Sequence, residues 1–185
     1  MKKINKIALI FSIFIGTYCN AQMKGNHTFL TENGRVVLNG ILADTSVQLV
    51  TQNLYALLNY DDARFELKAD LATFNSGNYK IDSILKGSET KTISFTGKLD
   101  LDFINVEGHP PLDFLVDGQL SNSNKLINGK GRLEHVFDQG AISCILTLSF
   151  ILDASDLGFN FEGIDLEDEI RIEVMQIVMN KLEDF

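Results

Sequence analysis

Few residues of this sequence have the type and spacing that catalysis or metal binding requires. The three histidines, His27, His109 and His135, have no partner at a metal-ligand spacing. Cys144 lies in the most apolar segment, where burial raises the pKa of a thiol and makes it inert. No Gly-x-Ser-x-Gly nucleophile motif is present. The sequence therefore predicts no catalytic residue, no metal and no cofactor, and an enzyme that uses His109 or His135 is only a third hypothesis.

The segment EGHPPLDFLV, residues 107–116, brings His109 next to both prolines of the chain. A proline cannot donate to a strand ladder, and it pushes the residue before it toward extended geometry. We therefore interpret Pro110 and Pro111 as a stiff approach to a strand that begins at Leu112. His109 falls outside the alternation of that strand and is expected to face solvent.

The first 21 residues have the pattern of a secretory signal peptide. Three lysines precede an apolar run at 7–15, which is too short to span a bilayer, and small residues lead up to Ala21. We expect cleavage after Ala21, a mature domain at 22–185, and a periplasmic or secreted protein. A lipid anchor on Cys19 is the rival interpretation, although Tyr18 stands where a lipoprotein signal has a small residue.

The mature chain is strongly acidic. Removing the three lysines of the signal from 16 basic residues leaves 13 against 25 acidic ones, a formal charge of −12. This charge disfavours nucleic acids and anionic lipid surfaces as partners, because both attract basic patches. Cys144 is then the only cysteine, so no intrachain disulfide can form. About 164 residues are enough for one domain with a sizeable core.

Strict alternation of apolar and polar residues recurs along the mature chain and predicts half-buried strands. It is clearest in RFELKADLATF (64–74), ISFTGKLDLDFINV (93–106), LDFLVDGQL (112–120) and AISCILTLSFILD (141–153). Asn33-Gly34 is typical of a two-residue hairpin turn. Residues 46–60 and 169–182 fit both strand and helix periods, and we interpret both as strands. The pattern favours an antiparallel sandwich or barrel.

Five phenylalanines share the apolar side of these strands: Phe65, Phe95, Phe103, Phe114 and Phe150. A barrel of about eight strands has an interior that side chains either fill or line around one small ligand. A lumen lined by aromatic rings suits an apolar ligand. Rings that merely fill the core are equally compatible with the sequence.

The order of these strand motifs resembles the YceI-like family of exported, lipocalin-like proteins associated with polyisoprenoid binding. The resemblance rests on FELKADLATF (65–74), SFTGKL (94–99), VDGQL (116–120), the residues Phe150, Leu152 and Asp156, and the final LEDEIRIEVMQIVMNK (166–181). Two departures concern polar positions. Ile81 and Ile84 stand where many relatives have arginine and histidine, and Ser121 and Asn122 replace a histidine-glycine pair.

The resemblance implies an all-β, antiparallel, lipocalin-like barrel of about eight strands that holds an apolar molecule, such as a polyisoprenoid or another lipid, and performs no catalysis. The candidate ligand-binding residues are those on the inner side of the strands. They are Phe65, Leu67, Phe95, Leu99, Leu101, Phe103, Phe114, Val116, Leu146, Leu148 and Phe150. The alternative is an interaction module that docks another envelope protein through strand edges or an acidic face such as DLEDE (165–169).

Overall fold

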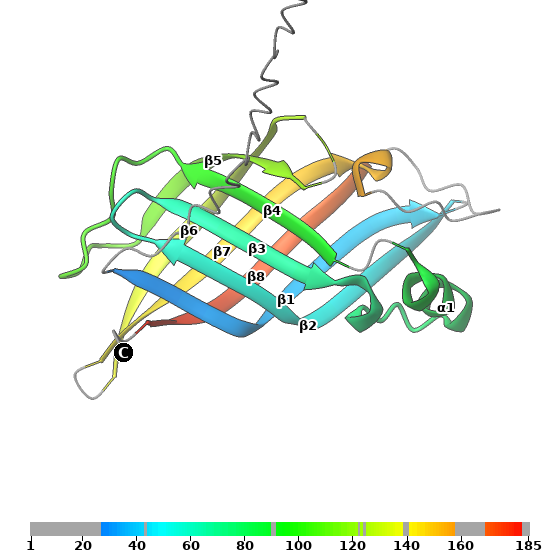
Figure 1. Cartoon of the computed structure of the whole chain (residues 1–185), viewed down its shortest axis with the longest axis horizontal. Coiled ribbons are helices and arrows are strands. Elements are labelled where there is room, and N and C mark those ends of the chain that lie inside the picture. Colours follow the sequence, from blue (N-terminus) through cyan, green and yellow to red (C-terminus); the bar gives the residue numbers. More distant parts are fainter. Residues whose placement is uncertain are drawn as a thin grey trace, which may run out of the picture.

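The chain folds into one closed barrel of eight antiparallel strands (Figure 1). The computed structural model describes residues 27–42, 44–89, 92–121, 123, 125–138, 141–157 and 169–182. The predicted signal peptide and residues 165–168 of the acidic run lie outside the described residues. Within the described part of the chain, no helix has the length and apolar character needed to cross a membrane.

Strands that are consecutive in sequence are neighbours in the barrel, and β1 pairs with β8 to close it. The strands are β1 (Thr28–Leu42), β2 (Thr45–Asn59), β3 (Arg64–Asp70), β4 (Thr92–Leu99), β5 (Leu112–Leu120), β6 (Ile127–Asp138), β7 (Ala141–Asp153) and β8 (Glu169–Lys181). The 3-10 helix η1 (Leu71–Thr73) and the helix α1 (Tyr79–Gly87) join β3 to β4, and the 3-10 helix η2 (Ala154–Leu157) follows β7. The barrel prediction is confirmed.

The alternating patterns form strands because each places one apolar face toward the barrel interior. β5 and β7 have the predicted bounds, and the two ambiguous segments are strands β2 and β8. In β5 the burial of successive side chains alternates regularly from Asp113 to Leu120. The period of two therefore positions the inner face correctly along most of the chain.

The strand prediction is wrong at two places, the predicted turn at Asn33-Gly34 and the end of β4. Asn33-Gly34 is not a hairpin turn, because β1 runs through it with an irregular register between Thr31 and Val36. A side chain at Gly34 would meet Ile177 at 3.0 Å, so the glycine allows close packing at this irregularity instead of a chain reversal.

The strand predicted in residues 93–106, with alternation through Phe103, ends at Leu99. Beyond it the chain crosses the end of the barrel, where the Ile104 amide donates to the Tyr60 carbonyl at 2.8 Å. As a result Leu101 is only partly buried, and Phe103 is 67% exposed instead of facing inward.

Aromatic rings fit inside the barrel because glycines on neighbouring strands leave room for them. A Cβ atom at Gly118 would lie 2.6 Å from Phe95, and one at Gly131 would lie 2.5 Å from Phe114. Both distances are below van der Waals contact. These glycines therefore match the rings in shape, as a close-packed core requires.

Candidate ligand-binding cavity

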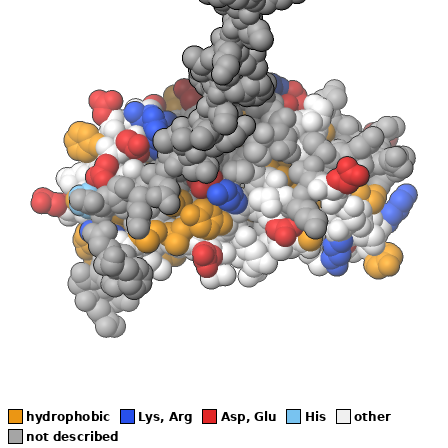
Figure 2. All heavy atoms as spheres, viewed as in Figure 1, with side chains coloured by type: hydrophobic (Ala, Val, Ile, Leu, Met, Phe, Trp, Pro, Cys, Tyr) orange, Lys and Arg blue, Asp and Glu red, His pale blue; other side chains and the backbone are white. Residues whose placement is uncertain are grey.

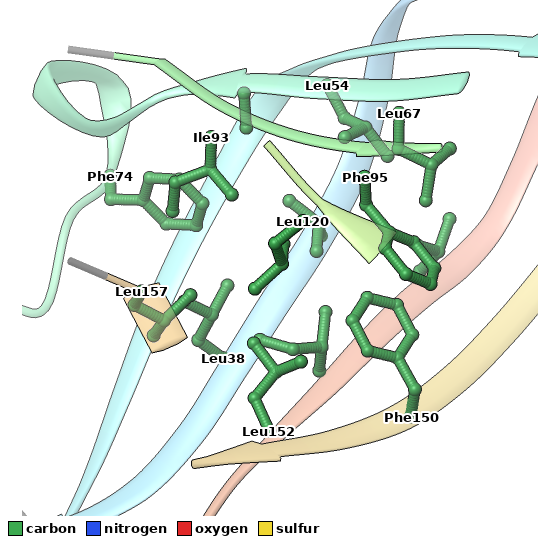
Figure 3. Close-up of a pocket in the computed structure, with 14 residues that line it drawn as sticks. Leu38, Leu54, Leu67, Phe74, Ile93, Phe95, Leu120, Phe150, Leu152 and Leu157 are labelled. Carbon is green, nitrogen blue, oxygen red and sulfur yellow. The ribbon is translucent and has the colours of Figure 1, made fainter. Parts of the chain in front are cut away.

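One half of the barrel interior contains an apolar cavity (Figure 3). It lies toward the end of the barrel that carries η1 and η2, and every one of the 14 side chains that line it is apolar. They are Val36, Leu38, Leu54, Leu67, Ala69, Phe74, Ile93, Phe95, Leu120, Phe150, Leu152, Leu157, Ile172 and Val174. A site lined by apolar side chains alone selects for hydrocarbon and offers no side chain to orient a charged ligand.

A stack of phenylalanines separates the cavity from the filled half of the barrel. The rings of Phe95 and Phe150 are stacked with centroids 4.5 Å apart, and Phe65 lies behind Phe95 at 5.4 Å. Figure 3 shows Phe95 and Phe150 side by side at one side of the cavity. Because aromatic pairs of this kind add to the energy of burial, this wall is a rigid boundary.

Phe74 forms part of the cavity rim and belongs to the segment between β3 and β4, not to a strand. The Asp70 side chain caps η1 by accepting from the Ala72 amide at 2.9 Å. Asn75 then exchanges two backbone hydrogen bonds with Val50 of β2, at 2.9 and 3.0 Å. These bonds anchor the chain on both sides of Phe74 and direct its ring into the barrel end.

Leu157 lines the cavity from η2. This short helix is tethered on its outer side, where the Lys125 ammonium pairs with Asp153 and Asp156. The Ser123 hydroxyl also donates to Asp156 at 3.2 Å. Because these contacts are largely solvent-exposed, they fix η2 more weakly than strand pairing fixes the barrel wall.

The cavity is small. Water-sized spheres can occupy ≈ 40 Å³ of it. By the same measure one water needs about 10–15 Å³, so the space holds about three groups of that size. It accommodates the branched end of an apolar chain, whereas a long chain needs side chains at the rim to move.

The structure distributes the eleven predicted ligand-binding residues over the whole barrel. Three line the cavity: Leu67, Phe95 and Phe150. Six are buried in the core without lining it: Phe65, Leu99, Phe114, Val116, Leu146 and Leu148. Leu101 packs against the edge of the core, and Phe103 lies on the surface. Contact between these residues and a ligand stays a prediction.

Several lining residues were missed from the sequence. Leu120, Leu152 and Val174 carry the same period-two signal as the predicted residues, but periodicity does not show which half of the barrel is filled. Phe74 and Leu157 lie outside any strand and carry no such signal.

At the opposite end of the barrel His109 is not directed to solvent, contrary to the prediction. Its ring is half-buried against that of His135, with centroids 4.1 Å apart. Burial lowers the pKa of His135, and the neighbouring His109 lowers it further. Cys144 is fully buried, and burial raises the pKa of its thiol to about 12, which agrees with the predicted inert core residue.

The alternative function, an interaction module that docks another protein, requires an exposed strand edge or an acidic face on the surface of the barrel. β1 and β8 pair with each other and close the barrel, whereas β2 extends beyond β3, with which it pairs only from Tyr55 to Asn59. Figure 2 shows acidic side chains spread over one face among basic and apolar ones, not gathered into a single acidic patch. Neither the closed strand order nor this mixed surface indicates a particular face for docking a partner.

The fold and the cavity define a lipocalin-like barrel with an apolar interior. One solved structure with this fold is a polyisoprenoid-binding domain from Saccharophagus degradans implicated in plant cell wall breakdown. It is 9% identical, has a TM-score of 0.60, and the match covers 85% of this chain and 98% of that one. Another is BcnA from Burkholderia cenocepacia, with 13% identity, a TM-score of 0.50, and coverage of 80% and 96%.

These likenesses confirm the predicted YceI-like fold, and at such low identities they show the fold alone. No protein-family model and no curated protein matches the chain.

Proposed function

We propose that this protein binds the apolar end of a lipid, such as a polyisoprenoid, in the apolar cavity of the barrel, and that it performs no chemistry on it. The observation that carries the proposal is a cavity inside the barrel with 14 apolar lining residues. The solved domain from Saccharophagus degradans, described as polyisoprenoid-binding, supports the choice of ligand class.

The size of the cavity determines how such a ligand would bind. Burying about three carbons contributes roughly 2–3 kcal/mol at about 0.8 kcal/mol per CH₂. A micromolar complex needs about 8 kcal/mol. The rest of the ligand's hydrocarbon chain must therefore be covered by protein as well. We place it between Phe74 and Leu157, because these residues project from short segments outside the strands and can move apart at a lower free-energy cost than strand residues.

The test is the identification of bound lipid. Protein purified without detergent is extracted with organic solvent, and the extract is analysed by mass spectrometry beside that of a Leu152→Phe variant, in which the added ring atoms occupy the cavity. We expect an apolar lipid from the wild type and little from the variant. Equal amounts from both proteins, or none from either, would contradict the proposal.

The ligand class is tested separately with lipid-free protein. A short isoprenoid alcohol and a linear alcohol of the same carbon number are titrated against a fluorescent apolar probe. Preference for the branched alcohol supports a polyisoprenoid, because the cavity holds a compact branched group. Equal competition by the two alcohols would agree with a lipid-binding role but would contradict a polyisoprenoid as the specific ligand.

We also propose that the protein acts outside the cytoplasm after cleavage behind Ala21. The support is the basic start and the apolar run at 7–15. The intact mass of protein recovered from its native envelope or medium should correspond to a chain that begins at Gln22. A mass that includes acyl chains on Cys19 would establish the lipoprotein alternative instead.

A further inference from the structure

A second cluster of polar groups lies at the barrel end opposite the cavity, where the chain between β4 and β5 contacts β6. His109 from the crossing segment and His135 from β6 have ring centroids 4.1 Å apart, with ring planes tilted by 43°. Behind His135 lies Tyr60, whose ring stacks on that of Phe29 at 4.3 Å. The two histidine rings therefore pack against each other, and His135 also packs against the ring of Tyr60.

Hydrogen bonding leaves His109 with one free ring nitrogen. Its Nδ1 lies 2.7 Å from the carbonyl oxygen of Pro110. A carbonyl oxygen only accepts, so Nδ1 carries the proton and Nε2 carries the lone pair. That Nε2 atom is buried and has no hydrogen-bond partner.

In His135 the two ring nitrogens have the opposite roles, with Nε2 hydrogen-bonded and Nδ1 without a partner. Its Nε2 lies 3.0 Å from the Tyr60 hydroxyl. We assign Nε2–H of His135 as the donor and the Tyr60 hydroxyl oxygen as the acceptor, which leaves the lone pair of His135 on Nδ1. That Nδ1 atom is also buried without a partner.

We propose that His109 Nε2 and His135 Nδ1 are the two protein ligands of a site for a divalent transition-metal ion, Cu²⁺ above all. Buried polar atoms without partners call for an explanation such as a bound ion. Imidazole is a suitable ligand for Cu²⁺, which binds such sites more tightly than Ni²⁺ or Zn²⁺.

The ring separation fits two adjacent coordination positions. With metal–nitrogen distances of about 2.0–2.1 Å, two imidazoles at a right angle have centroids about 4.5 Å apart, and two in line about 6 Å apart. The observed 4.1 Å is close to the right-angle value that tetragonal Cu²⁺ uses.

The remaining ring nitrogens also fit this role. Ligating histidines almost always donate their second N–H to a fixed oxygen, which sets the tautomer. The Pro110 carbonyl and the Tyr60 hydroxyl supply those oxygens here. Among the described residues no group of three or more His, Cys, Asp or Glu side chains surrounds such a site, so water completes the coordination and the affinity is modest.

The site is tested with untagged protein titrated with CuCl₂ in a buffer that contains glycine, a weak competitor that removes copper from the chain's amino terminus. Calorimetry measures the stoichiometry, and electron paramagnetic resonance reports nitrogen ligands. The variants are His109→Ala and His135→Ala. The matched control is His27→Ala, because His27 is the third histidine and bonds Asp61 at 2.8 Å on the surface.

We expect one copper ion per wild-type chain, an unchanged result for His27→Ala, and binding weakened about tenfold or more by either of the other substitutions. Circular dichroism checks that each variant is folded, and broadening of the His109 and His135 proton resonances by Cu²⁺ in the wild type reports the site without any substitution. Absence of saturable binding, equal binding by all variants, or broadening confined to His27 would overturn the proposal.

Discussion

Replacing Leu152 by phenylalanine should fill the cavity and abolish ligand binding while leaving the barrel stable. Leu152 is buried on the inner face of β7 and lines the cavity. The matched control is Leu148→Phe, the same change on the same strand and the same face. Leu148 is equally buried, pairs with Gly131 and Val174, and does not line the cavity.

The two substitutions differ in the space that they meet. Phenylalanine adds three carbons to leucine, and at Leu152 the cavity of ≈ 40 Å³ can take them. Their burial contributes up to about 2 kcal/mol, which imperfect shape offsets, so the free energy of unfolding should change by less than about 1 kcal/mol. At Leu148 the same atoms meet a filled core, and overpacking should cost about 1–3 kcal/mol.

Urea denaturation measures the stability of both variants, and competition with a fluorescent apolar probe measures ligand binding. Leu152→Phe should bind at least tenfold more weakly and unfold near the wild-type midpoint, whereas Leu148→Phe should bind normally and unfold earlier. Equal destabilisation by both changes would mean that the space beside Leu152 is not available. Normal binding by a stable Leu152→Phe protein would mean that the ligand site lies elsewhere.

Three further predictions concern the core, the thiol and the end of the barrel. Gly118→Ala should lower the free energy of unfolding by about 1–3 kcal/mol in urea denaturation, because its Cβ would lie 2.6 Å from the confined ring of Phe95. An unchanged denaturation midpoint would contradict close packing of Phe95 against Gly118. With its pKa near 12, Cys144 should react with iodoacetamide at pH 8 about a thousandfold more slowly in the folded than in the unfolded protein, and rapid labelling of folded protein would refute this. Hydrogen bonds from the Ser76 hydroxyl and amide lower the pKa of Asp82, so the stability they give is present above about pH 4 and is lost as the pH falls through the lowered pKa. Asp82→Asn should therefore lower the melting temperature at pH 7 more than at pH 3. A decrease that is the same at both pH values would contradict this cause.

The barrel could be predicted from the sequence because alternation depends on a local rule. Each strand must turn one face to the interior, so Phe114 and Val116 in β5 or Leu146 and Leu148 in β7 identify their own orientation. The rule fails where the chain leaves the sheet. Phe103 continues the alternation in sequence but follows the end of β4, so its ring lies outside.

The cavity and the histidine pair could not be predicted, because both depend on contacts between distant parts of the chain. Whether a ring fits the interior depends on the residues of the neighbouring strand, as when Gly118 of β5 leaves room for Phe95 of β4. Phe74 reaches the cavity through a turn whose hydrogen bonds involve Val50, far away in sequence. His109 and His135 meet only because the segment after β4 folds back over the barrel end.

The most direct test of apolar binding in one half of the barrel is an NMR titration of leucine methyl groups with a short isoprenoid alcohol. The methyl resonances of Leu38, Leu120 and Leu152 should shift in a saturable way, whereas those of Leu133 and Leu148 in the filled half should stay in place. Shifts spread evenly over the barrel, or confined to leucines on its outer surface, would contradict a ligand site in this cavity.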